Sequence, residues 1–173
     1  MAEDLKVMHY NNGASIPNVA DDATWQHLIT AAYRNYNNSS NDTIYGKLYN
    51  YYTLAGNLCP TGWHVPSLAE WNVLINYLGG ANIAGRKLKT NSDLWVNPNN
   101  GATNESGFTA IPGGYCNPSP FGRGINGYWW TTTQQYPEVP IAWYVTITNA
   151  TLDAFTNVDL MTDGCCVRCI KDN

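Results

Sequence analysis

The segment from residue 58 to residue 80 constrains the fold more than any other part of the chain. Ser67 is followed three residues later by Glu70, the spacing of a capping box, in which each side chain accepts a hydrogen bond from a free backbone amide. Apolar side chains then recur at helical spacing, and Gly79-Gly80 predicts the end of the helix. We therefore predict a turn, a short buried strand and a helix that begins after Ser67. The recurring apolar residues are Trp71, Leu74, Ile75 and Leu78.

The composition is typical of a secreted or surface module rich in β-structure. The chain has 173 residues, of which only 13% are charged, and its formal net charge is −4. This length fits one domain, which we place at residues 1–173. Without a basic run, nucleic acid is not an expected partner, and no apolar run approaches the roughly 18 residues that a membrane span needs. We expect an extracellular or cell-surface location, or a place on a phage virion.

The five cysteines allow more than one interpretation. Cys166 and Cys169 form a C-x-x-C pattern, which is compatible with redox chemistry or half a zinc site. There is no second such pattern, and the three histidines lie far from it in sequence, so we favour a structural role. We predict a disulfide between Cys59 and Cys169, closing a loop of about a hundred residues and contributing about 4–5 kcal/mol in the chain-entropy model. At least one of Cys116, Cys165 and Cys166 should then be a free thiol.

The first half of the chain is predicted to hold two further short helices. Aromatic and apolar side chains recur at helical spacing over residues 25–32 and again over residues 45–52. Between them, the Asn- and Ser-rich stretch 35–43 predicts a solvated loop.

The second half is predicted to be strand-rich. Apolar or alternating segments are separated by turn residues, which indicates an α+β domain with helices packed on small, twisted antiparallel sheets and long loops. The predicted strands are 108–115, 127–133, 142–148, 158–160 and 165–170.

Several motifs, in a fixed order, give the chain a family resemblance. They include Cys-Pro-Thr-Gly-Trp-His-Val-Pro-Ser at 59–67, Gly-Tyr-Trp-Trp-Thr-Thr-Thr at 127–133 and Val-Arg-Cys-Ile-Lys-Asp at 167–172. The chain resembles, from end to end, the Fibrobacter succinogenes major paralogous domain family of bacterial surface proteins, common in Bacteroidota. The other matching segments are 1–6, 45–50 and 104–115.

That family in turn resembles the C-type-lectin fold in the form found in formylglycine-generating enzymes. The likeness lies in the helix start at 65–71 and the closing strand at 164–168. It implies a C-type-lectin-like domain with neighbouring termini and long loops over one face, forming the C-terminal part of a longer surface protein. Cys116 and the Cys165-Cys166 pair fall where the family pattern is broken, which argues against an inherited function for these thiols.

The resemblance also implies that residues 116–163 are a candidate variable segment. Proteins of this fold are targets of diversity-generating retroelements, which mutate adenines near the 3′ end of the gene. Randomising the adenines of an Asn codon never yields Trp, Gln, Glu, Lys or Met, and residues 144–163 contain only Met161 from that set. A fixed strand and turn would have a similar composition, so the sequence is compatible with a diversified and with an undiversified surface.

We predict a binding surface in the same segment. Its Tyr, Phe, Asn, Thr and Asp residues combine rigid contact area with adaptable hydrogen bonding, although strand alternation lets only some of them reach a ligand. Trp129 and Trp130 should point to opposite faces, one into the core and the other beneath the site. The candidate ligand-binding residues are Tyr144, Thr146, Thr148, Asn149, Thr151, Asp153, Phe155, Asn157, Asp159, Asn117, Phe121, Arg123 and Trp130.

The favoured function is therefore non-enzymatic recognition of a protein or glycan on another cell or host surface. The module would belong to an adhesin, a pilus or a phage receptor-binding protein, with upstream domains, pilus or virion components as further partners, and without catalytic residues, metal or cofactor. One alternative is a fixed, metal-independent carbohydrate-binding module. A weaker one is a copper-dependent oxidase that uses Cys165, Cys166 and Cys169 as soft ligands. The calcium-binding triplets of animal lectins are absent from the sequence.

Overall fold

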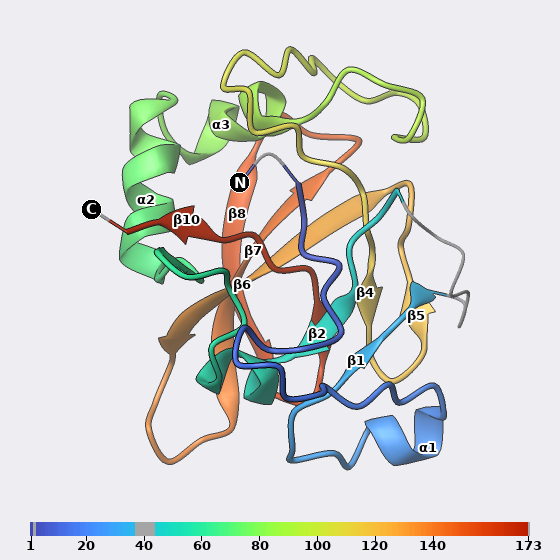
Figure 1. Ribbon diagram of the computed structural model, residues 1–173. Helices are drawn as coiled ribbons and strands as arrows, with labels where there is room; N and C mark the ends of the chain where they lie inside the picture. The colour runs from blue at the N-terminus through green and yellow to red at the C-terminus, as the bar shows by residue number, and fades with distance from the viewer. Residues whose placement is uncertain (2, 37–43, 173) are drawn as a thin grey trace.

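The computed structural model describes residues 1, 3–36 and 44–172, and it has an α+β architecture with antiparallel sheets (Figure 1). The sheets have the strand orders β1-β2-β9-β4-β5, β10-β3 and β6-β7-β8. The helices are α1 (Asp22–Trp25), a 3₁₀ helix (Tyr51–Ala55), α2 (Leu68–Tyr77) and α3 (Ala81–Leu88). The strands are β1 (Tyr33–Arg34), β2 (Leu48–Asn50), β3 (Trp63–His64), β4 (Tyr115–Cys116), β5 (Pro120–Phe121), β6 (Asn126–Gln134), β7 (Ile141–Thr148), β8 (Ala154–Leu160), β9 (Gly164–Cys165) and β10 (Ile170–Lys171).

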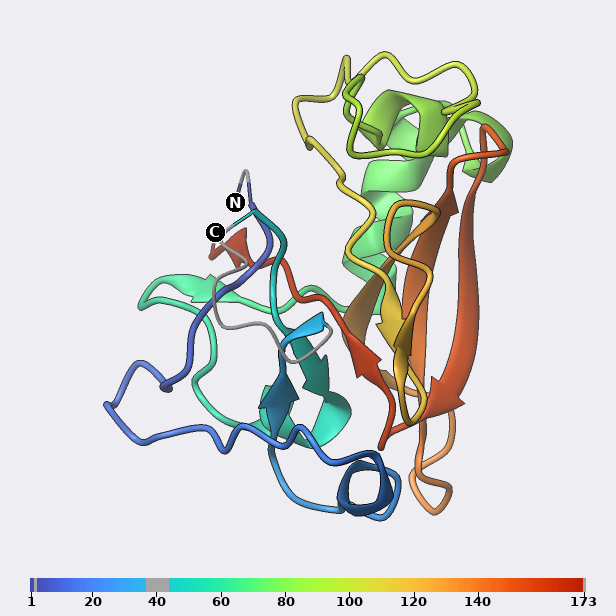
Figure 2. The ribbon, with the colours of Figure 1, turned by 90° about the vertical axis from the view of Figure 1, so that its right-hand side faces the viewer.

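The three long strands β6, β7 and β8 form one side of the molecule, and the short strands of the other sheets face them (Figure 2). Neighbouring residues of β6 point into different parts of the core. Trp129 packs with Trp71 of α2, at a ring-centroid distance of 6.3 Å. Trp130 packs with Tyr51, at 5.6 Å. The sheet is therefore covered on both faces where β6 crosses the centre of the domain.

The capping box and the helix after it are confirmed. The Ser67 amide donates to Glu70 Oε2 at 2.8 Å, and Ser67 Oγ accepts from the Glu70 amide at 3.3 Å. Trp71, Ile75 and Leu78 are buried, so the predicted stripe faces the core. The strand before the helix, β3, is half-buried and not buried as expected.

Two of the predicted helices are wrong. Helix α1 ends at Trp25, and Ile29 is 72% exposed, so no apolar stripe runs over residues 25–32. Residues 48–50 form strand β2, followed by a 3₁₀ helix. Leu48 and Tyr49 belong to different core clusters, and a strand buried on both faces has no alternation to distinguish it from a helix. The predicted loop at 35–43 lies largely outside the described residues, and α3 was not predicted.

The strands of the last third are confirmed as β6, β7 and β8, each longer than the predicted segment. The strand predicted at 108–115 is wrong, because only Tyr115 at its end enters a strand, β4. Gly114, at φ 79°, precedes that strand in a conformation that glycine adopts without strain. The strand predicted at 165–170 is divided between β9 and β10, which belong to different sheets.

The predicted disulfide between Cys59 and Cys169 is present, with its Cα atoms 5.9 Å apart. Cys116, Cys165 and Cys166 are all free and buried. Cys165 lies in the cluster of Trp130, whereas Cys166 lies in the cluster of Trp129. The two neighbouring thiols thus point into different parts of the core, as expected for a strand.

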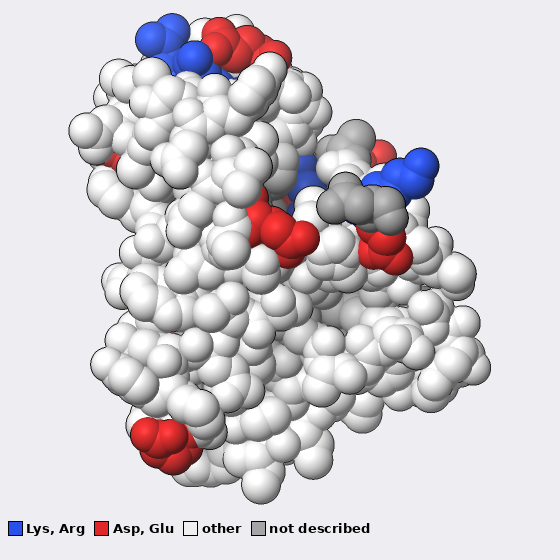
Figure 3. Space-filling view, turned by 90° about the vertical axis from the view of Figure 1, so that its left-hand side faces the viewer, with Lys and Arg blue, Asp and Glu red and all other residues white. Residues whose placement is uncertain are grey.

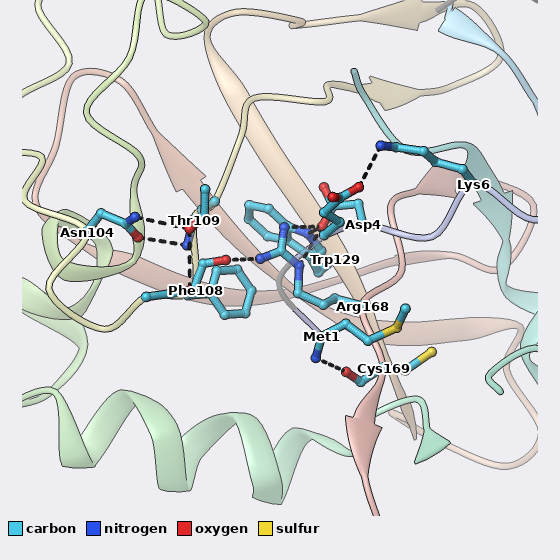
Figure 4. A network of polar contacts seen from close by, with 12 residues as sticks. Met1, Asp4, Lys6, Asn104, Phe108, Thr109, Trp129, Arg168 and Cys169 are labelled. Atoms are coloured by element: carbon cyan, nitrogen blue, oxygen red, sulfur yellow. Dashed lines mark hydrogen bonds and ion pairs between the residues drawn. The ribbon is translucent and has the colours of Figure 1, made fainter. Parts of the chain in front are cut away.

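A buried ion pair joins the two ends of the chain (Figure 4). Arg168 Nε donates to Asp4 Oδ1 at 2.7 Å, and the Trp129 indole donates to the same oxygen at 2.8 Å. The guanidinium also lies over the Phe108 ring, 4.0 Å from its centroid. Three distant segments therefore meet at one carboxylate, and a fourth, that of Phe108, contacts the guanidinium.

A buried lysine fastens the turn between β7 and β8. Lys89, at the end of α3, is fully buried, and burial lowers its pKa to about 8. Its ammonium thus stays charged at neutral pH inside a cage of backbone carbonyls, where it takes the place that a bound cation could occupy. It donates to the carbonyl oxygens of Asn100 at 3.0 Å, Thr148 at 3.0 Å and Thr151 at 2.8 Å.

Replacing Lys89 with Met should destabilise the fold. The variant leaves several buried carbonyls without a donor, and we expect the free energy of unfolding to fall by about 3 kcal/mol in urea titrations. The matched control is Lys87→Met, which removes only the ion pair with half-exposed Glu105 and should cost less than about 1 kcal/mol. Equal losses for the two variants would contradict the role given to Lys89.

Candidate functional site

The register of the three-stranded sheet brings alternate side chains of β6, β7 and β8 to one face. Thr146 of β7 lies opposite Tyr128 of β6 and Phe155 of β8. Tyr144 lies opposite Asn157 in the same way. Since side chains directly opposite each other in an antiparallel sheet share a face, these residues form one continuous surface.

Aromatic rings cover that surface and continue onto β4 and β5. The Tyr115 ring lies 4.9 Å from the Tyr128 ring and 5.2 Å from the Phe121 ring, centroid to centroid. Tyr128 and Tyr144 are 5.5 Å apart. We call the surface of Tyr115, Phe121, Tyr128, Tyr144 and Phe155, with the polar side chains between and around them, the aromatic face.

The aromatic face has a fixed centre and an accessible edge. Tyr115 and Tyr144 are buried, and Tyr144 rests on Trp130, whose ring centroid is 6.2 Å away. Phe121 and Phe155 are instead 47% and 45% exposed. Apolar rings that remain in water after folding represent hydrophobic area available for binding.

Two carboxyl groups meet the Tyr115 hydroxyl at the edge of the face. The hydroxyl lies 2.5 Å from Asp163 Oδ2 and 2.6 Å from Asp159 Oδ2, and Asn117 Nδ2 donates to Asp163 Oδ2 at 3.3 Å. A hydroxyl has one proton and can donate to only one of the two carboxyls at a time. Burial, reinforced by the neighbouring Asp159, raises the pKa of Asp163 to about 8, so at neutral pH the pair retains a proton.

The Asp163 carboxyl should make stability fall as the pH rises. Its unfolded pKa is near 3.8 and its folded pKa is about 8, so the folded state binds more protons across this window. The free energy of unfolding should then decrease from about pH 4 to pH 8, by at most about 1.4 kcal/mol per pH unit.

Urea unfolding at several pH values checks this dependence. Asp163→Asn should flatten the curve between pH 4 and pH 8, because the amide does not titrate. The control variant Glu138→Gln, in the exposed loop between β6 and β7, should leave the slope unchanged. A slope that survives in Asp163→Asn would show that another group is responsible.

Most of the predicted binding residues gather at the aromatic face. The turn residues Asn149, Thr151 and Asp153 do not. Asn149 is buried and donates to the Val96 carbonyl at 2.8 Å, and Thr151 belongs to the Lys89 cage. The residues that the structure brings to the face or its rim are Tyr144, Thr146, Thr148, Phe155, Asn157, Asp159, Asn117 and Phe121.

Two other candidates, Arg123 and Trp130, are engaged by aromatic side chains around them. Arg123 stacks between the rings of Tyr36 and Tyr45, with centroid distances of 4.2 and 4.3 Å. Trp129 and Trp130 point to opposite faces of β6, as expected, and both are fully buried. Trp130 supports Tyr144 from below and donates its indole hydrogen to a main-chain carbonyl, so it cannot itself touch a ligand at the surface.

Sequence analysis missed Tyr115, Tyr128 and Asp163. Tyr128 could have been found, because it lies two residues before Trp130 and so shares its face of a regular strand. Tyr115 and Asp163 reach the site from outside the three-stranded sheet, and no local pattern marks them.

The thiols give no sign of a shared site. Burial raises the pKa values of Cys165 and Cys166 well above the ordinary value, and raises that of Cys116 to about 12. Protonated, buried thiols that point apart are poor copper ligands. Among the described residues, no group of three or more His, Cys, Asp or Glu side chains is placed to hold a metal ion.

Comparison with known proteins identifies one family. The model of the Fibrobacter succinogenes major domain matches residues 1–171. No curated protein and no solved structure matches the chain. In the described part of the chain, no helix has the length and apolar character needed to cross a membrane.

Proposed function

Because this chain belongs to the Fibrobacter succinogenes major domain family, we propose that it is a non-enzymatic recognition module of an extracellular surface. Its aromatic face binds a protein or a glycan on another cell or host surface. The observation that carries the proposal is the pairing of exposed Phe121 and Phe155 with a buried tyrosine layer that holds the face rigid. The module is the binding end of an adhesin or of a phage receptor-binding protein.

The chemistry of the face suits recognition. Rigid aromatic side chains lose little conformational entropy on binding, and they supply most of the binding energy in many interfaces. The amides of Asn117 and Asn157, both exposed at the rim, add hydrogen bonds that fix the orientation of a ligand. The face combines exposed apolar rings with polar side chains beside them, and binding interfaces commonly contain both.

We assign the domain to the C-type-lectin-like fold. The assignment is supported by neighbouring termini, since the Met1 amino group donates to the Cys169 carbonyl at 2.8 Å. It is also supported by the long irregular segment between α3 and β4, which connects the helices to the strand-rich half.

Alanine substitutions at the exposed rings test the binding role. After screening arrays of purified surface proteins and glycans for a ligand, the affinity of each variant is measured for the ligand found. Phe121→Ala and Phe155→Ala should each weaken binding by about tenfold or more while leaving the melting temperature nearly unchanged. Tyr144→Ala should weaken both binding and stability, because Tyr144 is buried over Trp130.

The matched control is Tyr77→Ala, which removes an 85% exposed ring from α2. It should leave binding unchanged. If Phe121→Ala and Phe155→Ala bind as well as the parent chain, the aromatic face is not the recognition surface.

We further propose that the segment 116–163 is diversified by a retroelement. Exposed and buried positions alternate along it. Thr146, which faces the site, lies between Val145 and Ile147, which are fully buried. Variation can therefore change the face without touching the core beneath it.

A display library tests this tolerance. Randomising the exposed positions together should leave most clones folded and resistant to protease, whereas randomising an equal number of buried positions should unfold most of them. Equal losses in the two libraries would contradict the proposal. The exposed set is Asn117, Phe121, Phe155 and Asn157, and the buried set is Trp130, Val145, Ile147 and Ala154.

A further inference from the structure

A concave site lies beside the disulfide, and none of its lining residues belongs to the aromatic face. This cavity has a volume of about 560 Å³ and is lined chiefly by residues 54–65, with contributions from Asn11, Thr132 and Asp172. Small-molecule sites commonly fall in this range of size. Figure 3 shows a hollow on the side of the molecule that carries the C-terminus, with acidic side chains beside it.

The walls of the cavity are held rigidly. The Cys59–Cys169 disulfide fastens the lining segment to the end of the chain. The main-chain amide of Asn11 donates to the main-chain carbonyl of Asn57 at 2.9 Å. The main-chain amide of Asp172 donates to the main-chain carbonyl of Gly62, also at 2.9 Å. Because these contacts close the segment from both ends, the cavity exists before any ligand arrives, which lowers the entropic cost of binding.

The polar lining has a defined charge. His64 Nδ1 lies 2.6 Å from Asp172 Oδ1, and His64 Nε2 lies 2.9 Å from Glu70 Oε1. The hydrogen bonds to these carboxylates raise the pKa of His64 above its ordinary value. Even when the His64 imidazole is protonated, His64, Asp172 and Glu70 together carry a net charge of −1. The cavity therefore disfavours anionic ligands.

The remaining lining residues are suited to a ligand that carries hydroxyl groups on an apolar ring. The half-buried Trp63 offers an aromatic surface, and the exposed side chains of Asn11, Asn57 and Thr132 offer donors and acceptors. Amides and carboxylates can each engage two neighbouring hydroxyls, while an indole packs against the C–H face of a sugar.

We propose that this cavity is a binding site for a neutral saccharide. It is independent of the aromatic face, because the two sites share no residue. Trp63 provides the packing surface, and Asn57 and Asp172 are the polar residues that orient the sugar.

The test uses the full chain and an array of neutral oligosaccharides of glucose, galactose, mannose and xylose, with uronate-containing oligosaccharides as the charged comparison. For the sugars retained, titration is followed by the indole N–H resonance of Trp63, assigned with Trp63→Phe. We expect neutral sugars to shift this resonance and uronates to bind at least about tenfold more weakly. Asn57→Ala should weaken the binding of neutral sugars by about tenfold.

The control variant is Asn76→Ala, which removes the same kind of amide from an exposed position on α2 and should leave saccharide binding at the cavity unchanged. The proposal is overturned if no neutral sugar shifts the Trp63 resonance, if uronates bind equally well, or if Asn57→Ala and Asn76→Ala behave alike. Such a result would leave the proposed function unaffected, because that function depends on Phe121 and Phe155.

Discussion

The buried ion pair between Asp4 and Arg168 is the interaction on which the rest of the structure depends. It joins the first segment of the chain to the last, and its carboxylate also receives the indole hydrogen of Trp129 in β6. Breaking such a pair leaves an uncompensated charge in the core, which typically costs about 3–5 kcal/mol. The disulfide closes the same end of the molecule covalently, since Cys169 follows Arg168 directly. The closure of the ends thus fixes β6, and β6 fixes the sheet that carries the aromatic face.

One face of the sheet packs on the helices, and the other carries the aromatic face, for which we propose the binding role. Val145 and Ile147 point toward the cluster of Trp129 and the helices, whereas Tyr144 and Thr146 point toward the aromatic face. At the far end of β7, the Lys89 ammonium holds the turn through main-chain carbonyls and not through side chains. Hydrogen bonds to main-chain carbonyls form whatever side chains the turn carries, so this anchor persists when residues of the neighbouring strands change, while the Asn149 side chain adds its own contact with the Val96 carbonyl.

Sequence analysis predicted correctly the features that depend on residues close together in the chain. It failed where a feature depends on contacts between distant segments. The capping box of Ser67 and Glu70 involves neighbours in the chain, and the helix after it was predicted correctly. Strand β2 was mistaken for a helix because tertiary contacts bury both of its faces. At the site, side-chain composition and strand alternation led to the choice of Tyr144, Phe155 and Asn157, although residues 154–157 were not predicted to be part of a strand. Neither could show that Tyr115 and Asp163 meet there, since their contact depends on how separate sheets pack.

We propose that the aromatic face is a recognition surface whose exposed residues vary in sequence while the core residues beneath it stay constant. Sequencing the locus across the source population, from codon 110 to the end, tests this most directly. We predict substitutions at template adenines that change Thr146, Phe155 and Asn157 and spare Val145 and Ile147. An invariant segment, or substitutions that fall as often on the buried positions as on the exposed ones, would contradict it.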